Sequence, residues 1–333
     1  IPDSVKTISV LDRTKEPGAL GDPLYMDVRT MYYNEENAPE VYGGRYGLGS
    51  KDTTPGQIVA VYDNLEQATP KNQFTIGIND DVTYTSLPTV EGIDTEPEGT
   101  IRCKFWGLGS DGTVGANKSA IKIIGDKTNL YAQGYFAYDS KKSGGVTISH
   151  LRFGKNKIQS TYLINKADFV ACHNQAYVNQ YDLLKGLKKG GTFVLNCVWN
   201  EKELAEHLPA SIKRYLAKNG IDFYTIDATN IANEIGLGNR INMIMQSAFF
   251  KLAKVIPLED AISYLKEAVE ESYGKKGEKI VRMNNAAIDR GLSDLKRIDI
   301  PAEWANAEDN EREAVKVPEF IAEVLIPMTR QTG

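Results

Sequence analysis

Residues 105–145 read FWGLGSDGTVGANKSAIKIIGDKTNLYAQGYFAYDSKKSGG, a stretch that predicts a strand, a glycine turn, a helix and a second strand. The apolar run Ile101–Trp106 indicates the first strand. Gly107, Gly109 and Gly112 follow it with G-x-G-x-x-G spacing. This spacing is typical of turns that hold a nucleotide phosphate, provided that a strand precedes it and a helix follows.

The helix after the turn has one apolar face. Val114, Ile121 and Ile124 mark this face, and Gly125 is expected to end the helix before a second strand, Leu130–Tyr138. The glycines would let the backbone approach a ligand closely, and the first N–H groups of the helix could bind a phosphate. The alternative is a tight strand-to-helix turn that binds nothing.

Charged residues follow the second strand. Asp139 stands where a dinucleotide-binding fold holds its ribose with an acid. Lys141 and Lys142 come soon after, and two cations suit a phosphate better than a bare ribose. The unit as a whole therefore predicts a ligand that carries phosphate.

The bulk composition excludes several classes of protein. The chain has 333 residues, a length typical of two domains, with 41% hydrophobic and 25% charged residues as in ordinary globular proteins. Its net charge of −5 argues against a general nucleic-acid binder, and no apolar run approaches the length of a membrane span.

The start at Ile1, with no signal peptide, suggests a fragment or a processed chain. The cysteines, Cys103, Cys172 and Cys197, have no metal or cluster spacing and fit a reducing cytoplasm best.

A stretch rich in acids, prolines and glycines, residues 88–100, indicates a domain boundary near Glu98. Periodicity does not decide whether residues 58–65, in the region before it, form a strand or a helix. The other elements predicted there are strands at 5–12 and 74–78 and a helix at 24–33.

The region after Glu98 alternates strands with helices. This pattern predicts the three-layer α/β/α class, with largely parallel sheets covered by helices on both faces. Asn200 and Glu203 have the spacing of a capping box, and Pro209 should bend or split the helix that follows. The other predicted elements are strands at 146–153, 168–172, 192–198, 223–228 and 279–283 and helices at 176–188, 241–255 and 262–273.

No catalytic constellation emerges, because a nucleophile elbow, a Walker lysine and a thiamine-binding motif are all missing. His173 lies beside Cys172, but neighbours on a strand point to opposite faces, so we interpret the pair as structural. Asn242, at a helix start, and Asn284, after a predicted strand, stand where open α/β sheets hold ligands. Helix capping explains both asparagines equally well.

Several long segments resemble pyruvate:ferredoxin (flavodoxin) oxidoreductase, and the resemblance extends over essentially the whole chain. It implies that residues 1–98 are part of a transketolase C-terminal-like domain, residues 99–312 a gamma-type domain, and residues 313–333 a linker toward a ferredoxin-like domain. The segments are LDRTKEPGALGDPLYMDV (11–28), GRYGLGSKDTTP (44–55), FWGLGSDGTVGANK (105–118), QGYFAYDSKKSGGVTISHLRFG (133–154), ADFVACHN (167–174) and GLGNRINMIMQSAFF (236–250).

The resemblance implies an enzyme of anaerobic metabolism that oxidatively decarboxylates pyruvate to acetyl-CoA and CO2 and passes electrons to ferredoxin or flavodoxin. It further implies a cytoplasmic homodimer. This chain has no thiamine-binding domain and no cluster cysteines, so thiamine diphosphate, Mg²⁺ and the 4Fe–4S clusters would belong to the rest of the enzyme. The chain alone is then expected to be inactive, with no catalytic or metal-binding residue of its own.

The family's gamma-type domain binds coenzyme A, and the resemblance implies where those contacts fall in this chain. Two alternatives stay open. One is a self-contained nicotinamide-dependent Rossmann-type oxidoreductase, and the other is a structural inter-domain module that binds nothing. The glycine pattern adds Gly109 to these contacts. The expected coenzyme A contacts are then Gly109, Ser110, Asp111, Gly112, Thr113, Val114, one of Lys141 and Lys142, Asn242 and Asn284.

Overall fold

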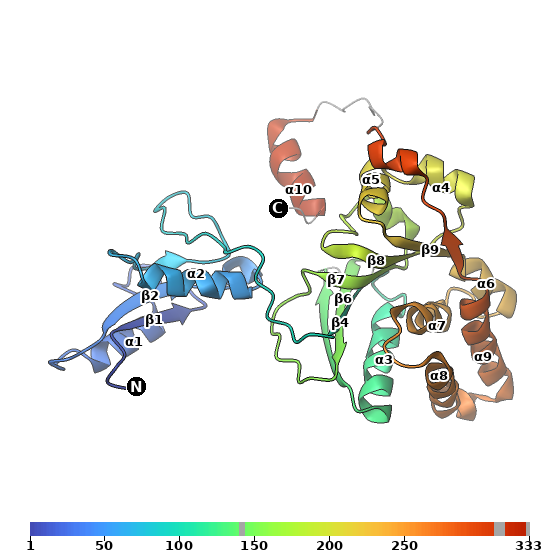
Figure 1. Ribbon diagram of the computed structural model, residues 1–333, viewed down its shortest axis with the longest axis horizontal. Helices are drawn as coiled ribbons and strands as arrows, with labels where there is room; N and C mark the ends of the chain where they lie inside the picture. Colours follow the sequence, from blue (N-terminus) through green and yellow to red (C-terminus); the bar gives the residue numbers. More distant parts are fainter. Residues whose placement is uncertain (140–143, 310–316, 331–333) are drawn as a thin grey trace. The chain divides into compact units, whose positions relative to one another are not determined.

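The computed structural model describes residues 1–139, 144–309 and 317–330. By its internal contacts the chain divides into two compact units (Figure 1). The first comprises Ile1–Glu96 together with Ser160–Leu163, and the second comprises the remainder. The domain types that the resemblance implies for the two units remain proposals.

The first unit is built on a three-stranded parallel sheet in the order β1-β2-β3. Thr54 and Gln57 form a capping box at the start of its second helix, so residues 58–65, which periodicity left undecided, are helical. The elements of this unit are β1 (Thr7–Asp12), α1 (Pro23–Met31), β2 (Glu40–Arg45), the 3-10 turn η1 (Leu48–Ser50), α2 (Pro55–Leu65) and β3 (Phe74–Thr75).

The second unit contains a seven-stranded mixed sheet in the order β10-β9-β8-β7-β4-β6-β5. Strands β4, β7, β8 and β9 are parallel to one another, whereas β6 pairs antiparallel with both β4 and β5, and β10 pairs antiparallel with β9. The strands are β4 (Ile101–Leu108), β5 (Tyr131–Tyr138), β6 (Val146–Gly154), β7 (Ala167–Cys172), β8 (Leu187–Asn196), β9 (Asp222–Ile226) and β10 (Lys296–Ile298).

Helices cover both faces of this sheet, which confirms the α/β class. Helices α3, α7, α8 and α9 lie on one side, and α4 and α5 lie on the other (Figure 1). The helices and 3-10 turns of the unit are α3 (Thr113–Lys127), η2 (Gln175–Asn179), α4 (Glu201–His207), α5 (Ala210–Lys218), α6 (Ala228–Ile235), α7 (Asn242–Ala253), α8 (Leu258–Tyr273), η3 (Gly274–Lys276), α9 (Glu278–Ser293) and η4 (Ala302–Asn306). A π-helical turn, η5 (Ile321–Leu325), and α10 (Ile326–Arg330) follow later in the chain.

The alternation of side chains along β4 builds two separate cores. Phe105 packs with α3 and α7 on one face, and its neighbour Trp106 belongs to the cluster under α4 and α5 on the other. Cys172 and His173 likewise point in opposite directions: Cys172 joins the Trp106 cluster, while the His173 ring meets Phe105 edge-on. The prediction that this Cys–His pair is structural rather than reactive therefore agrees with the packing.

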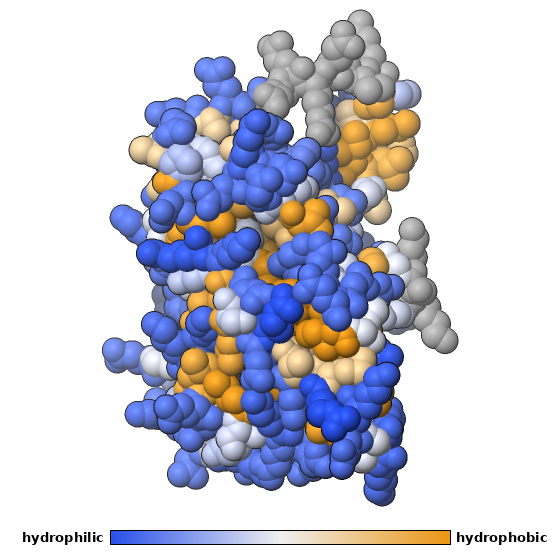
Figure 2. All heavy atoms as spheres, turned by 90° about the vertical axis from the view of Figure 1, so that its right-hand side faces the viewer, coloured by the Kyte–Doolittle hydropathy of each residue, from blue (hydrophilic) through white to orange (hydrophobic). Residues whose placement is uncertain are grey.

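The outer face of the second unit around α6 and α9 is mainly hydrophilic, with apolar patches between the charged residues (Figure 2). Ion pairs join the helices at this surface. Lys266 of α8 contacts Asp289 of α9 at 2.8 Å, and Arg290 of α9 contacts Glu234 of α6 at 3.1 Å.

No helix in the described ranges is long and apolar enough to cross a membrane.

Two predicted elements have the wrong type, and several others have ends that differ from the prediction. Residues 176–188 are not a helix, because the short η2 is followed by turns and β8 already begins at Leu187. Residues 279–283 belong to helix α9 rather than to a strand. Helix α3 continues past Gly125 to Lys127. The capping box at Asn200 and the division of the following helix at Pro209 are confirmed.

Candidate functional site

The glycine turn and the end of β5 lie at the same edge of the second sheet. Strands β4 and β5 run in the same direction, because each is antiparallel to β6 between them. Gly109 donates its N–H to the carbonyl of Gly145 over 2.7 Å, which ties the turn to the segment entering β6. The β4–α3–β5 unit thus has the strand directions that the sequence predicts, with one strand inserted.

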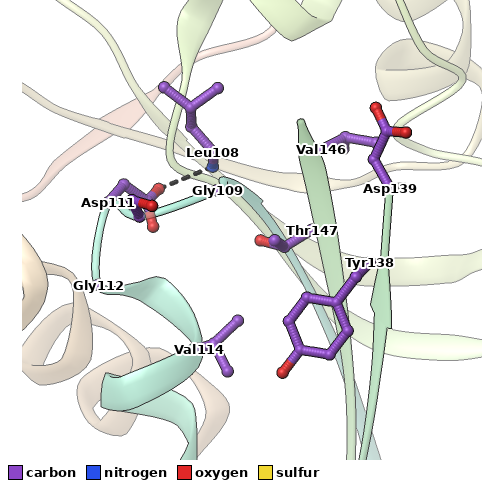
Figure 3. Close-up of a pocket in the computed structure, with 10 residues that line it drawn as sticks. Leu108, Gly109, Asp111, Gly112, Val114, Tyr138, Asp139, Val146 and Thr147 are labelled. Atoms are coloured by element: carbon purple, nitrogen blue, oxygen red, sulfur yellow. Dashed lines mark hydrogen bonds between the residues drawn. The ribbon is translucent and has the colours of Figure 1, made fainter. Parts of the chain in front are cut away.

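A pocket of about 210 Å³ opens at this edge (Figure 3). The turn forms one wall, and the Val114 and Tyr138 side chains face each other from α3 and β5. The residues that line the pocket are Leu108, Gly109, Ser110, Asp111, Gly112, Val114, Tyr138, Asp139, Val146 and Thr147.

Helix α3 begins at the pocket and leaves backbone donors for a ligand. The first N–H groups of a helix have no partner within the helix. The Asp111 carboxylate accepts the N–H of Thr113 at 2.7 Å. Within the described residues, no hydrogen bond uses the N–H groups of Val114 and Gly115. These two donors, at the positive end of a 15-residue helix, are suited to an anion.

The Asp111 carboxylate points into the turn and holds its shape. One oxygen accepts the N–H of Leu108 at 2.8 Å and the Thr113 hydroxyl at 2.9 Å, and the other accepts the Thr113 N–H. Ser110 has a φ of 76°, an uncommon conformation for a residue with a side chain, so the turn is held under local strain. The Asp111 charge is therefore compensated by donors of the turn itself.

Two of the pattern glycines are required by packing within the chain. A Cβ on Gly107 would lie 2.6 Å from the Thr113 hydroxyl oxygen, so this glycine lets α3 start close to β4. Gly112 has a φ of +88°, and a Cβ there would lie 2.5 Å from the Asn242 amide nitrogen. Asn242, at the start of α7, thus lies against the turn, as the prediction of a shared site requires.

Replacing Gly112 with alanine should destabilise the second unit by about 1–3 kcal/mol, because the left-handed backbone and the Asn242 contact both oppose a Cβ. Gly115 is the matched control, since its Cβ would meet nothing within 4 Å and alanine favours the helix. Urea unfolding of the two variants measures both effects. Equal stability of Gly112→Ala and Gly115→Ala would contradict the role assigned to Gly112.

The charges around the pocket are mixed. Asp111 and Asp139 bring two carboxylates. Lys118 lies one helical turn beyond Val114, with its ammonium 5.4 Å from the centre of the Phe136 ring on β5. Lys141 and Lys142 lie outside the described residues, in the short connection from β5 to β6.

The structure brings most of the predicted site residues together. Gly109, Ser110, Asp111, Gly112 and Val114 line the pocket. The Thr113 hydroxyl is buried beneath the turn, where it contacts Asp111 and lies 2.7 Å from His173 Nδ1.

Asn284 is the exception among the described residues. It lies inside α9, where its amide donates to the carbonyl of Ile280, and it is not part of the pocket lining. The sequence analysis did not identify Leu108, Tyr138, Val146 or Thr147 as site residues. Only their position at the predicted strand ends, close in sequence to the glycine turn or to Lys141 and Lys142, could have indicated that they belong to the site.

Comparisons with known proteins give a consistent result. The chain matches the family model of pyruvate ferredoxin/flavodoxin oxidoreductase over residues 102–293. Over its whole length it is 60% identical to the pyruvate-flavodoxin oxidoreductase of Enterobacter agglomerans and to the pyruvate:ferredoxin oxidoreductase of Moorella thermoacetica, covering 28% of each. It is also similar to the crystal structure of pyruvate oxidoreductase subunit PORC from Thermotoga maritima, with 16% identity and a TM-score of 0.48, over 60% of this chain and 99% of that one. The chain therefore spans just over a quarter of the length of these two oxidoreductases.

Proposed function

Because the chain belongs to the pyruvate ferredoxin/flavodoxin oxidoreductase family, we propose that it is the coenzyme A-binding portion of a longer, cytoplasmic enzyme. That enzyme would oxidatively decarboxylate pyruvate to acetyl-CoA and CO2 and pass the electrons to ferredoxin or flavodoxin. The units described above would pack against the other domains of the same enzyme, and the full-length protein would be a homodimer.

The pocket at the start of α3 is the observation that carries this proposal. Coenzyme A contains a diphosphate, and the pocket offers two N–H groups at a helix N-terminus, within a turn whose own acid is already compensated. A pocket of about 210 Å³ is smaller than those that enclose whole drug-sized ligands, roughly 300 Å³ or more. It would therefore hold the diphosphate, with the rest of the ligand lying over the neighbouring surface.

The buried side of the turn also fits a polar ligand. The Asn242 amide oxygen, next to Gly112, is buried without a hydrogen-bond partner in the described part of the chain. Buried polar atoms normally find a partner, so this oxygen needs a donor, which an ordered water or a donor group of the ligand other than its diphosphate would supply. Thiamine diphosphate, Mg²⁺ and the iron–sulfur clusters would be supplied by the parts of the enzyme outside this chain.

Calorimetric titration of the chain with coenzyme A and, separately, with NAD tests the proposal. We expect coenzyme A to bind with saturable heat and NAD to give none. Saturable binding of NAD without binding of coenzyme A would favour a nicotinamide-dependent oxidoreductase. If neither ligand binds, the turn is structural.

Removing both lysines after β5 should weaken coenzyme A binding by one to two decades. A phosphate of coenzyme A would contact one of Lys141 and Lys142, and a hydrogen bond between charged groups is worth about 1.5–3 kcal/mol. The measurement is the dissociation constant of Lys141→Ala/Lys142→Ala across a salt series.

The matched control for this variant is Lys275→Ala/Lys276→Ala, because this pair is also two consecutive lysines and lies in η3, outside the pocket lining. It changes the net charge by the same amount. If the two double variants bind coenzyme A equally well at low salt, Lys141 and Lys142 have no part in the site.

A further inference from the structure

We propose that His173 is a positioning residue of the coenzyme A turn, which it holds through Thr113 in the shape that turns the Asp111 carboxylate away from the ligand. The effect on affinity rests on the proposed function, whereas the hydrogen-bond arrangement itself does not. His173 is not part of the pocket lining, and the residue is only 6% exposed.

The geometry assigns the proton on the His173 ring. The Thr113 hydroxyl has a single hydrogen, and its oxygen lies 2.9 Å from Asp111 Oδ2 and 2.7 Å from His173 Nδ1. A carboxylate only accepts hydrogen bonds, so the hydroxyl hydrogen is donated to Asp111. The hydroxyl oxygen must then accept from Nδ1–H, which makes His173 the Nδ1-protonated tautomer with a bare acceptor at Nε2.

The backbone at His173 is fixed from two neighbouring strands. Its N–H donates to the carbonyl of Trp106 on β4 at 2.9 Å, and its own carbonyl accepts from the Asn196 amide at the end of β8, also at 2.9 Å. The Asn196 amide oxygen in turn accepts the N–H of Ala228 at 3.0 Å. The imidazole therefore projects toward Thr113 from a rigid part of the sheet.

The other ring nitrogen of His173, Nε2, is also buried. His173 Nε2 has no partner within the described ranges, and the same holds for Asn117 Nδ2 and for both amide atoms of Gln246. Asn117 follows Thr113 by one turn of α3, and Gln246 follows Asn242 by one turn of α7, on helices that pack together. A bare Nε2 acceptor needs a donor, which an ordered water can supply.

This arrangement explains how a turn that carries an acid can accept an anion. With Nδ1–H donating to the Thr113 oxygen, the hydroxyl can only donate toward Asp111. The carboxylate then keeps its three donors, the N–H groups of Leu108 and Thr113 and the Thr113 hydroxyl. Loss of the hydroxyl leaves the carboxylate with two donors instead of three, so its charge is less compensated and repels a phosphate more strongly.

Two pairs of substitutions separate positioning from simple packing. Thr113→Ser keeps the hydroxyl, and Thr113→Val removes it from a side chain of the same shape. His173→Asn can place an amide donor where Nδ1 stands, whereas the amide of His173→Gln reaches the Nε2 position instead. We expect coenzyme A affinity to fall about tenfold in Thr113→Val and His173→Gln and to stay within about threefold in Thr113→Ser and His173→Asn.

Nitrogen-15 NMR of the histidine rings in the whole chain tests the tautomer without any ligand. The chain has three histidines, so the signal missing in His173→Asn identifies this ring. A neutral ring protonated at Nδ1 at pH 7 is the expected result, and protonation at Nε2 overturns the proposal. If the wild-type chain does not bind coenzyme A, the proposed function fails while this spectrum still decides the hydrogen-bond arrangement.

Urea unfolding of all four variants provides the remaining comparison. If affinity follows stability across the four variants, with no advantage for Thr113→Ser and His173→Asn, the two residues are structural and the positioning role is refuted. If the conservative variants retain affinity at the same stability as their partners, the role stands.

Discussion

Lowering the pH from 7 to 4 is expected to remove about 6 kcal/mol from the stability of the second unit, because two buried histidines must stay neutral in the fold. Burial lowers the pKa of His150 to about 3, helped by the nearby charges of Lys104 and Arg152. Burial also lowers the pKa of His173 to about 4, although the Asp111 carboxylate opposes this shift.

The sign of the effect follows from where the protons bind. An unfolded histidine has a pKa of about 6.5, so between pH 6.5 and 4 the unfolded chain takes up protons that the folded one excludes. The stabilisation is complete above pH 6.5 and is lost as the pH falls toward the folded-state pKa values. At pH 4 each histidine has lowered the free energy of unfolding by about 3 kcal/mol, and the total free energy of unfolding of a protein is typically 5–15 kcal/mol.

Urea unfolding at pH 7, 6, 5 and 4 provides the measurement, with the double variant His150→Asn/His173→Asn beside the wild type. The Asn side chain can accept from the Ile164 N–H, as His150 Nδ1 does at 3.1 Å, and can donate to Thr113 as His173 does. Between pH 7 and 4 the double variant should lose about 6 kcal/mol less than the wild type. The exposed His207 is the control, and His207→Gln should leave the wild-type profile in place. Parallel profiles for the wild type and the double variant would show that these histidines do not govern acid stability.

Replacing Gly291 with alanine should cost about 2 kcal/mol or more, because this glycine lets α9 approach α7 closely. Its Cβ would lie 2.4 Å from the carbonyl oxygen of Ile244 and 2.1 Å from the Ser247 hydroxyl oxygen. The first of these atoms belongs to the backbone, so the two helices would have to move apart. The lost packing should exceed the gain of roughly 1 kcal/mol that alanine normally brings to a helix.

Gly125→Ala is the matched control within α3. Gly125 is exposed, and a Cβ there would meet nothing within 4 Å, so the same substitution should stabilise the protein by about 0.5–1 kcal/mol. The difference in unfolding free energy between the two variants isolates the contact between α7 and α9. If both substitutions stabilise the protein, that contact can relax without cost.

The parts of the fold that sequence reasoning predicted correctly are those determined locally. The glycine turn follows from its spacing, and the helix starting at Glu201 from its capping box. The Pro209 break likewise needs no tertiary information, because the ring cannot continue a helix. Periodicity alone does not assign residues 58–65, which belong to the helix that Thr54 and Gln57 cap.

The errors arise where tertiary packing overrides a short apolar pattern. Tyr177, Leu183 and Leu184 have helix-like spacing, but they are buried by turns that lead into β8. The run Lys279–Met283 is too short to distinguish strand from helix, and it became part of α9. Because of this error Asn284 was expected at the end of a strand, whereas it lies inside α9.

Only one wall of the pocket could be predicted from the sequence. Its turn side is a contiguous motif, whereas Tyr138 and Thr147 reach it only because β6 lies between β4 and β5. Nothing in the local sequence of β6 specifies that insertion. Predicting the second wall would have required the strand order.

The inserted strand also sets the order in which this half of the sheet can assemble. Strands β5 and β6 form a hairpin and need only a short loop to close, so they can meet on the microsecond scale. Strand β4 can join them only when the chain through α3 has closed a loop several times longer, at a greater cost in chain entropy. We therefore expect the turn at the proposed ligand site to be completed late in folding, after the hairpin that forms its far wall.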